Sequence, residues 1–94
     1  MWWRRRVPEV AVMTREGCHL CTEMVRVVRD AAGRVPVAVR DLDVEVAAGR
    51  LEPSVHDRWT TLVPVLLVDG REVAHHRADA TAVRRALRRR RPAR

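Results

Sequence analysis

The sequence predicts one α/β domain in which the elements run in the order β-α-β-α-β-β-α and the strands form a four-stranded mixed sheet. The chain has 94 residues and 47% hydrophobic residues, which is enough for a single core. A strand, a helix and a strand follow one another within about thirty residues, so these two strands are expected to be parallel. Asp69-Gly70 between two later apolar runs predicts an antiparallel hairpin.

The first half of the chain contains the predicted β-α-β unit. Residues 9–13 form a short apolar run of strand type. Residues 14–17 connect it to a helix over about residues 18–32, and Gly33 stands where a glycine often ends a helix. Residues 35–42 then alternate as the second strand.

Residues 44–51 are ambiguous, because Gly49 weakens a helix there. Pro53 favours the start of the next helix, since proline suits the first helical position. Val55 and Trp59 lie four residues apart and are expected to share its buried face.

The second half of the chain predicts the hairpin and the last helix. Residues 63–68 and 71–76 are its two strands. Asp79 can cap the last helix, which would carry Val83 and Leu87 into the core.

Two cysteines, Cys18 and Cys21, carry the predicted chemistry. A bridge between residues three apart constrains almost no chain, so a role in stability is not expected. A pair at the first turn of the helix in a β-α-β unit is typical of a redox motif. The helix N-terminus stabilises a thiolate, and the thiolate is the species that attacks a disulfide.

The helix register assigns the two cysteines different roles. Cys21, Val25, Val28 and Ala32 recur at helical spacing, which puts Cys21 on the buried face. Cys18 lies where the chain enters the helix and meets solvent. We therefore predict that Cys18 is the nucleophile and Cys21 the resolving thiol.

The cysteines also allow alternatives. They could be ordinary buried residues. They could form a zinc site with two of the four histidines, His19, His56, His75 and His76. The histidine spacing does not fit a zinc finger, and the adjacent His75 and His76 would point to opposite faces of a strand. No metal ligand is therefore predicted, although an iron–sulfur cluster shared between two chains stays open.

The positive charge is concentrated at the C-terminus. The formal net charge is +7, and all basic residues are arginines. Residues 84–94 hold seven arginines and no acid, whereas the rest of the chain holds twelve arginines and twelve acids. No aromatic residue is interleaved with the run, so we interpret it as a solvated helix end and not as a nucleic-acid site.

The sequence divides into a lead-in (residues 1–8), a domain (residues 9–88) and an arginine-rich tail (residues 89–94). No apolar run approaches the length of about 20 residues that a membrane span needs. The first six residues show no secretory signal, so a cytoplasmic protein is expected.

Three segments together resemble bacterial glutaredoxin-like proteins of the thioredoxin superfamily: Thr14-Arg15-Glu16-Gly17-Cys18-His19-Leu20-Cys21, Leu62-Val63-Pro64-Val65 and Val68-Asp69-Gly70-Arg71-Glu72-Val73. The resemblance covers residues 9–88, and it implies that residues 44–51 extend the connection before the helix that Pro53 starts. It implies a thioredoxin-like fold and a monomeric thiol–disulfide oxidoreductase with no bound cofactor. The expected substrate is a protein disulfide or a small thiol, and the expected reductant is glutathione or another low-molecular-weight thiol.

The resemblance also implies a substrate site beside the cysteines. It makes Val63-Pro64 the cis-proline loop, where the backbone of Val63 could pair with an extended substrate. It places Arg15 where a basic residue could meet the carboxylate of a thiol cofactor, and Asp79 is retained. His19, if protonated, would favour the Cys18 thiolate.

Two positions depart from the family pattern. Leu62 stands where glutaredoxins typically have threonine, and His75-His76 stand near their glycine pair. Those glycines admit the glutathione backbone, whereas two histidine side chains would obstruct it.

Overall fold

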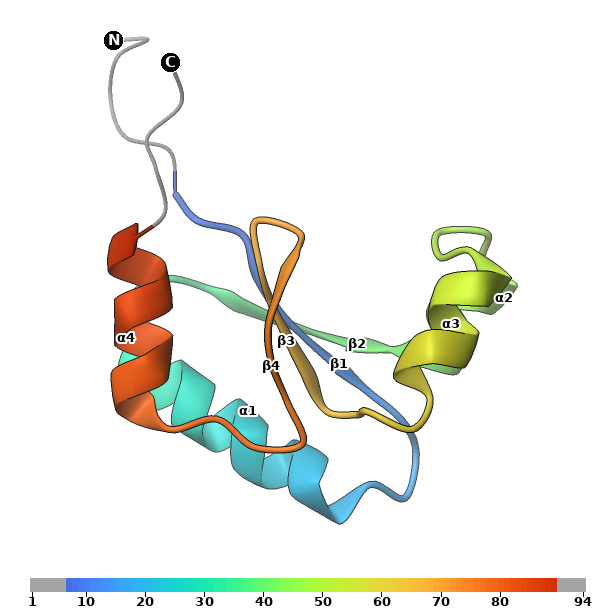
Figure 1. The fold of residues 1–94 in the computed structure, drawn as a ribbon, viewed down its shortest axis with the longest axis horizontal. Helices are drawn as coiled ribbons and strands as arrows, with labels where there is room; N and C mark the ends of the chain where they lie inside the picture. Colours follow the sequence, from blue (N-terminus) through green and yellow to red (C-terminus); the bar gives the residue numbers. More distant parts are fainter. Residues whose placement is uncertain (1–6, 90–94) are drawn as a thin grey trace, which may run out of the picture.

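The computed structural model describes residues 7–89. Its elements are β1 (Val10–Thr14), α1 (His19–Ala32), β2 (Val37–Asp41), α2 (Leu42–Ala47), α3 (Pro53–Trp59), β3 (Val65–Val68), β4 (Arg71–His75) and α4 (Ala80–Arg89) (Figure 1). The predicted order is confirmed, with one short helix, α2, added after β2. The arginine-rich tail beyond Arg89 and the first six residues of the lead-in lie outside the described residues.

The four strands form one mixed sheet in the order β2-β1-β3-β4. β1 pairs with β2 in parallel, while β3 is antiparallel to both β1 and β4. The parallel pair and the hairpin are those that the sequence predicts. β2 and β4 are the two edges of the sheet, and β1, which leads to the cysteines, is central (Figure 1).

The two faces of the sheet are covered differently. On one face, β1 and β3 pack against α1 and α4 through one cluster of buried residues: Val10, Val12, Met24, Val28, Leu66 and Val83. On the other face, α2 and α3 cover a smaller cluster: Met13, Leu42, Trp59 and Val65. The alternation of Val12 and Met13 along β1 produces this division, because successive strand side chains point to opposite faces.

The interpretation of residues 44–51 as a connection without a helix is wrong in part, because α2 lies over Leu42–Ala47. The Asp41 carboxylate caps this helix by accepting hydrogen bonds from the backbone N–H groups of Asp43 (2.8 Å) and Val44 (3.1 Å). Gly49 adopts a positive φ of 75° just after the helix. Gly49 therefore lies in the turn that follows a short helix and does not disrupt its interior.

The last helix follows the prediction. The Asp79 carboxylate accepts a hydrogen bond of 2.7 Å from the backbone N–H of Ala82, so it caps α4. Val83 is fully buried, and Leu87 packs against the same core. Across residues 7–89, no helix combines the length and apolar character that crossing a membrane requires.

Candidate active site

A tight turn brings the cysteine pair to the start of α1. Gly17 adopts a positive φ of 80°, which favours glycine over other residues. The backbone N–H of Cys18 donates to the carbonyl oxygen of Arg15 at 3.3 Å. Cys18 keeps an extended backbone as the N-cap, and the helix begins at His19, one residue later than predicted.

Cys18 and Cys21 form a disulfide, with their Cα atoms 5.4 Å apart. Cys21 is 6% exposed and lies on the buried side of α1, as predicted. Cys18 is only half-buried. The more exposed cysteine is therefore the one that precedes the helix.

The electrostatic environment of Cys18 is that of a helix N-terminus. The first turn of α1 carries no acidic residue, and the exposed His19 follows Cys18 directly. The unpaired N–H groups and the helix dipole of a first turn favour a negative charge. In the reduced protein this arrangement would favour a thiolate at Cys18 over a thiol.

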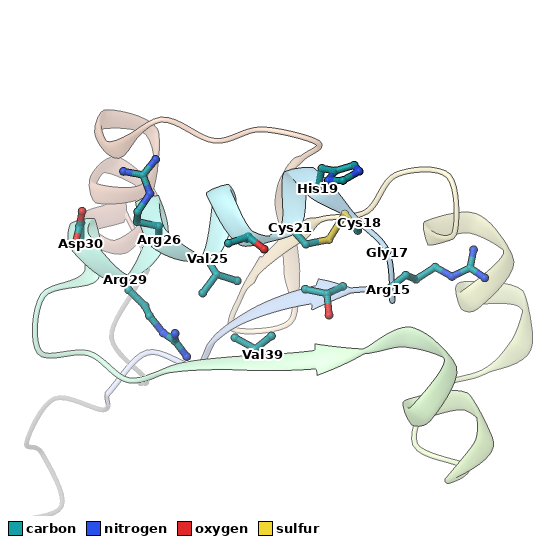
Figure 2. A pocket seen from close by; sticks show the side chains of 12 residues that line it. Arg15, Gly17, Cys18, His19, Cys21, Val25, Arg26, Arg29, Asp30 and Val39 are labelled. Carbon is teal, nitrogen blue, oxygen red and sulfur yellow. A yellow bond between two sulfur atoms is a disulfide. The ribbon is translucent and has the colours of Figure 1, made fainter.

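The disulfide lies at one end of an open groove of about 1090 Å³. The groove is lined by Thr14, Arg15, Gly17, Cys18, His19, Cys21, Thr22, Val25, Arg26, Arg29, Asp30 and Val39. It runs between α1 and the edge strand β2, with Val25 and Val39 on its sides and Arg26 and Arg29 far from the sulfurs (Figure 2). Three predicted site residues besides Cys18, namely Arg15, His19 and Cys21, share this groove.

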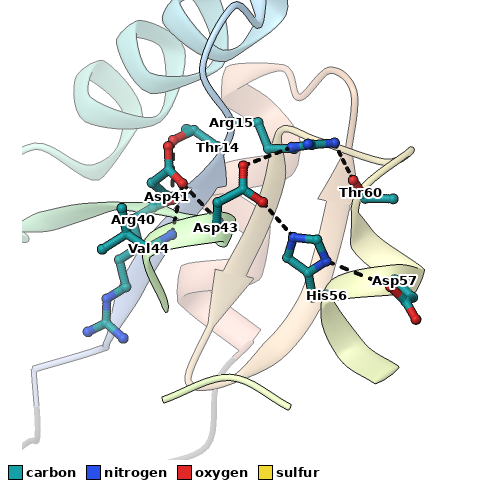
Figure 3. A network of polar contacts seen from close by, with 9 residues as sticks. All are labelled: Thr14, Arg15, Arg40, Asp41, Asp43, Val44, His56, Asp57 and Thr60. Atoms are coloured by element: carbon teal, nitrogen blue, oxygen red, sulfur yellow. Dashed lines mark hydrogen bonds and ion pairs between the residues drawn. The ribbon is translucent and has the colours of Figure 1, made fainter. Parts of the chain in front are cut away.

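The Arg15 side chain points away from the sulfurs (Figure 2) and joins a polar network with α2 and α3 (Figure 3). Its guanidinium contacts the Asp43 carboxylate at 3.4 Å and donates a short hydrogen bond to the hydroxyl of Thr60. His56 Nε2 contacts the other oxygen of Asp43 at 2.7 Å. The hydrogen bond from His56, together with Arg15, holds the pKa of Asp43 below its usual value.

This network attaches the turn before Cys18 to the helices on the opposite face of the sheet. Arg15 is 40% exposed, so one side of its guanidinium still meets solvent. Its role toward a substrate carboxylate stays a prediction.

The Val63–Pro64 peptide bond is cis, as the resemblance implies. Pro64 is fully buried. The backbone N–H of His76 donates to the carbonyl oxygens of Pro64 (2.8 Å) and Leu62 (3.2 Å), so this loop is held by the end of β4. Val63 and Pro64 do not line the groove beside α1. Pairing of Val63 with a substrate stays a prediction.

The expectation that His75 and His76 point to opposite faces is wrong. β4 ends at His75, and His76 adopts a positive φ of 65°, which redirects its side chain. The two rings therefore meet edge to face at 4.9 Å. His76 Nε2 lies 2.9 Å from the carbonyl oxygen of Thr61, next to the cis-proline loop. The backbone at His76 thus keeps a conformation that suits glycine, while its imidazole occupies space that a glycine would leave open.

Asp79 lies in the segment between β4 and α4. It lines a smaller hollow of about 290 Å³, together with Leu20, Glu23, Met24, His76, Arg77 and Ala78. One of its carboxylate oxygens already caps α4. Contact between Asp79 and a substrate stays a prediction.

The described residues contain no group of three or more histidine, cysteine or acidic side chains placed to hold a metal ion. The zinc site considered from the sequence would need at least one further ligand beside Cys18 and Cys21. The described geometry brings none of the histidines into such a group.

Sequence reasoning missed the far part of the groove, formed by Val25, Arg26, Arg29 and Val39. The available signal was the spacing of Arg26 and Arg29, which places both on one side of a helix. The sequence could not show that this side lies beside an edge strand, because that depends on the order of strands in the sheet.

Comparisons with known proteins bear on the fold and the family of this chain. An uncharacterised protein of Mycobacterium tuberculosis (strain H37Rv) and one of Mycobacterium bovis are each 29% identical over 77 residues, which is 82% of this chain and 79% of theirs. The solution structure of protein Ne2328 from Nitrosomonas europaea matches 89% of this chain and 95% of its own, with a TM-score of 0.65 and 25% identity. The fold is therefore thioredoxin-like. The model of the glutaredoxin-like domain family (DUF836) matches residues 9–88, so this chain belongs to that glutaredoxin-like family.

Proposed function

We propose that this protein is a dithiol oxidoreductase that exchanges disulfides through Cys18 and Cys21. The observation that carries the proposal is the Cys18–Cys21 disulfide at the N-terminus of α1, with Cys18 more exposed than Cys21. Membership of a glutaredoxin-like family supports the same chemistry.

In the reduced protein, the Cys18 thiolate attacks one sulfur of a substrate disulfide. A mixed disulfide forms between Cys18 and that half, and the other half leaves as a thiolate that takes a proton from water. The Cys21 thiolate then attacks the sulfur of Cys18, releases the second half and closes the disulfide of the protein. Two electrons pass from the protein to the substrate, and a low-molecular-weight thiol such as glutathione returns them.

The protein is proposed to act as a cytoplasmic monomer on disulfides of proteins or small thiols. The position of His76 beside the cis-proline loop favours substrates that do not need the glycine pair of typical glutaredoxins. Arg15, His19, Val63 and Asp79 remain candidates for contact with the substrate on the two sides of the sulfurs.

The test is a redox titration of the pure protein against thiol buffers, combined with mass spectrometry. We expect one reversible two-electron couple and a colourless protein. Cys18→Ser should lower disulfide exchange by at least about a thousandfold, because no nucleophile remains. Cys21→Ser should accumulate a mixed disulfide at Cys18, because nothing resolves it.

Wild-type activity in Cys18→Ser would contradict the assignment of the nucleophile. A brown protein with a charge-transfer spectrum would instead support the iron–sulfur alternative. Brief alkylation of the reduced protein near neutral pH gives an independent check, since Cys18 should be labelled before Cys21.

A further inference from the structure

The groove between α1 and β2 is a surface that disulfide exchange alone does not require. It begins at the sulfurs and continues along α1 past Val25, away from the cis-proline loop (Figure 2). We propose that it binds an extended, acidic peptide segment next to the reacting cysteine of a partner protein. This inference rests on the proposed function and specifies its substrate class.

The first argument is the continuity of the groove with the sulfurs. Cys18 and Cys21 line the same hollow as Val25 and Val39. A chain whose cysteine reacts with Cys18 can therefore extend into the groove. Val39 is 45% exposed, so an apolar side chain of the partner would cover surface that now meets water.

The second argument is the edge strand. β2 pairs only with β1, because it ends the sheet, so one side of its backbone has no partner strand among residues 7–89. Such an edge pairs readily with an extended peptide, whose main chain then supplies hydrogen bonds. Val39 belongs to this edge strand and also lines the groove, so an extended segment in the groove would lie next to a strand edge with which it can pair.

The third argument is charge. Arg26 and Arg29 line the groove, and no described ion pair or side-chain hydrogen bond involves either of them. Among residues 7–89, Asp30 is the only acidic residue that lines it. Arg15, by contrast, already binds Asp43. Arg26 and Arg29 are therefore available for carboxylates of a partner.

The helix geometry sets where those carboxylates should be. At 1.5 Å per residue, Arg26 and Arg29 lie about 12 and 16 Å along α1 from Cys18. An extended peptide advances about 3.3 Å per residue. The partner should therefore carry acidic residues about three to five positions from its cysteine.

The test uses reduced protein and peptides with a single cysteine, disulfide-linked to the chromophore thionitrobenzoate. One peptide has glutamates about three to five positions from the cysteine on both sides, and its matched control has glutamines there. Attack by Cys18 joins the peptide sulfur to the protein and releases the thionitrobenzoate thiolate, which is followed by its absorbance. We expect the acidic peptide to react about three- to tenfold faster at low salt, the effect of two exposed ion pairs.

Two double variants test whether Arg26 and Arg29 cause the preference for the acidic peptide. Arg26→Gln/Arg29→Gln should reduce it to less than about twofold. The matched control Arg84→Gln/Arg85→Gln removes the same charge from exposed positions of α4 that do not line the groove, and it should keep the preference. Equal loss in both variants, or retention in Arg26→Gln/Arg29→Gln, would overturn the inference.

A binding measurement separates this inference from the proposed function. The oxidised protein is titrated with the acidic peptide in which serine replaces cysteine, and backbone amides are followed by NMR. Shifts confined to α1 and β2 support the inference even if exchange fails, whereas shifts elsewhere or none contradict it. Exchange with a neutral small disulfide, but no peptide preference, would contradict the inference alone.

Discussion

The two hollows that flank α1 differ in size and in the residues that line them. On the side of α1 and β2 the groove is open, about 1090 Å³, and basic at its far end. On the side of β4 and α4 the hollow is about 290 Å³, and His76 extends to the carbonyl oxygen of Thr61. Among residues 7–89, the two cysteines line the larger groove and not the smaller hollow, which His76 lines. We therefore expect substrates to be distinguished by size and charge mainly in the groove beside α1.

Removing the side chain that partly fills the smaller hollow should give the largest change in exchange rate. His76→Gly removes the imidazole and places glycine at a position with a φ of 65°, which glycine accepts without strain. We expect exchange with a glutathione mixed disulfide to rise at least about tenfold. The rate with the acidic peptide should not change, because His76 does not line the groove beside α1. An unchanged rate with glutathione would show that His76 does not obstruct this side.

The open side can be tested by adding one negative charge to it. Val39→Glu on the edge strand β2 should slow the acidic peptide about three- to tenfold and leave a neutral small disulfide unaffected. Val73→Glu is the matched control, because Val73 is 36% exposed, against 45% for Val39, and lies on the opposite edge strand, β4. Slowing of equal size in both variants would mean that net charge, and not the groove, decides the rate.

A third contrast concerns how firmly the turn before Cys18 is held. The hydrogen bond from His56, with Arg15, keeps the pKa of Asp43 low in the folded protein. The unfolded chain therefore binds a proton at Asp43 more readily, so this contribution to stability is present above about pH 4 and is lost as the pH falls through the lower folded pKa.

Asp43→Asn should remove that part of the acid dependence of stability. The measurement is the urea concentration at the midpoint of unfolding. It is determined for wild type and variant at a series of pH values, from neutral pH down to the most acidic pH at which the wild type is still folded. Glu16→Gln is the control, because Glu16 is exposed and forms no described ion pair. Parallel curves for wild type and Asp43→Asn would show that the network does not stabilise the fold.

Local patterns predicted most of the fold. The Asp69-Gly70 hairpin, the buried Trp59 and the Asp79 cap each depend on neighbouring residues, and each is found in the structure. α2 was missed because Gly49 was interpreted as a helix breaker, whereas it lies in the turn after the helix. The sequence contained the Asp41 cap that could have corrected this interpretation.

The candidate site was predicted only in part, for physical reasons. The burial of Cys21 follows from helix periodicity, but the cis Val63–Pro64 bond followed only from the family resemblance, since few X–Pro bonds are cis. The contact between His75 and His76 depends on one backbone angle that no pattern encodes. The groove requires knowing that α1 lies beside an edge strand, which is a property of the whole sheet.

The smallest effect is expected from the C-terminal arginines, and it separates local from long-range charge. Removing residues 90–94 deletes three arginines outside the described residues and leaves Val83, which anchors α4 in the core. Exchange with a neutral small disulfide should stay within about twofold of wild type, because distant charges do not act on a neutral substrate. With the acidic peptide, a modest loss of rate at low salt should vanish at high salt, since 0.1 M salt screens charge over about 10 Å. The loss of rate with the acidic peptide that Arg26→Gln/Arg29→Gln causes should persist better at high salt, because the ion pairs of Arg26 and Arg29 form in contact with the peptide. A large loss with the neutral substrate at high salt would show instead that the C-terminal arginines belong to the site or to the fold.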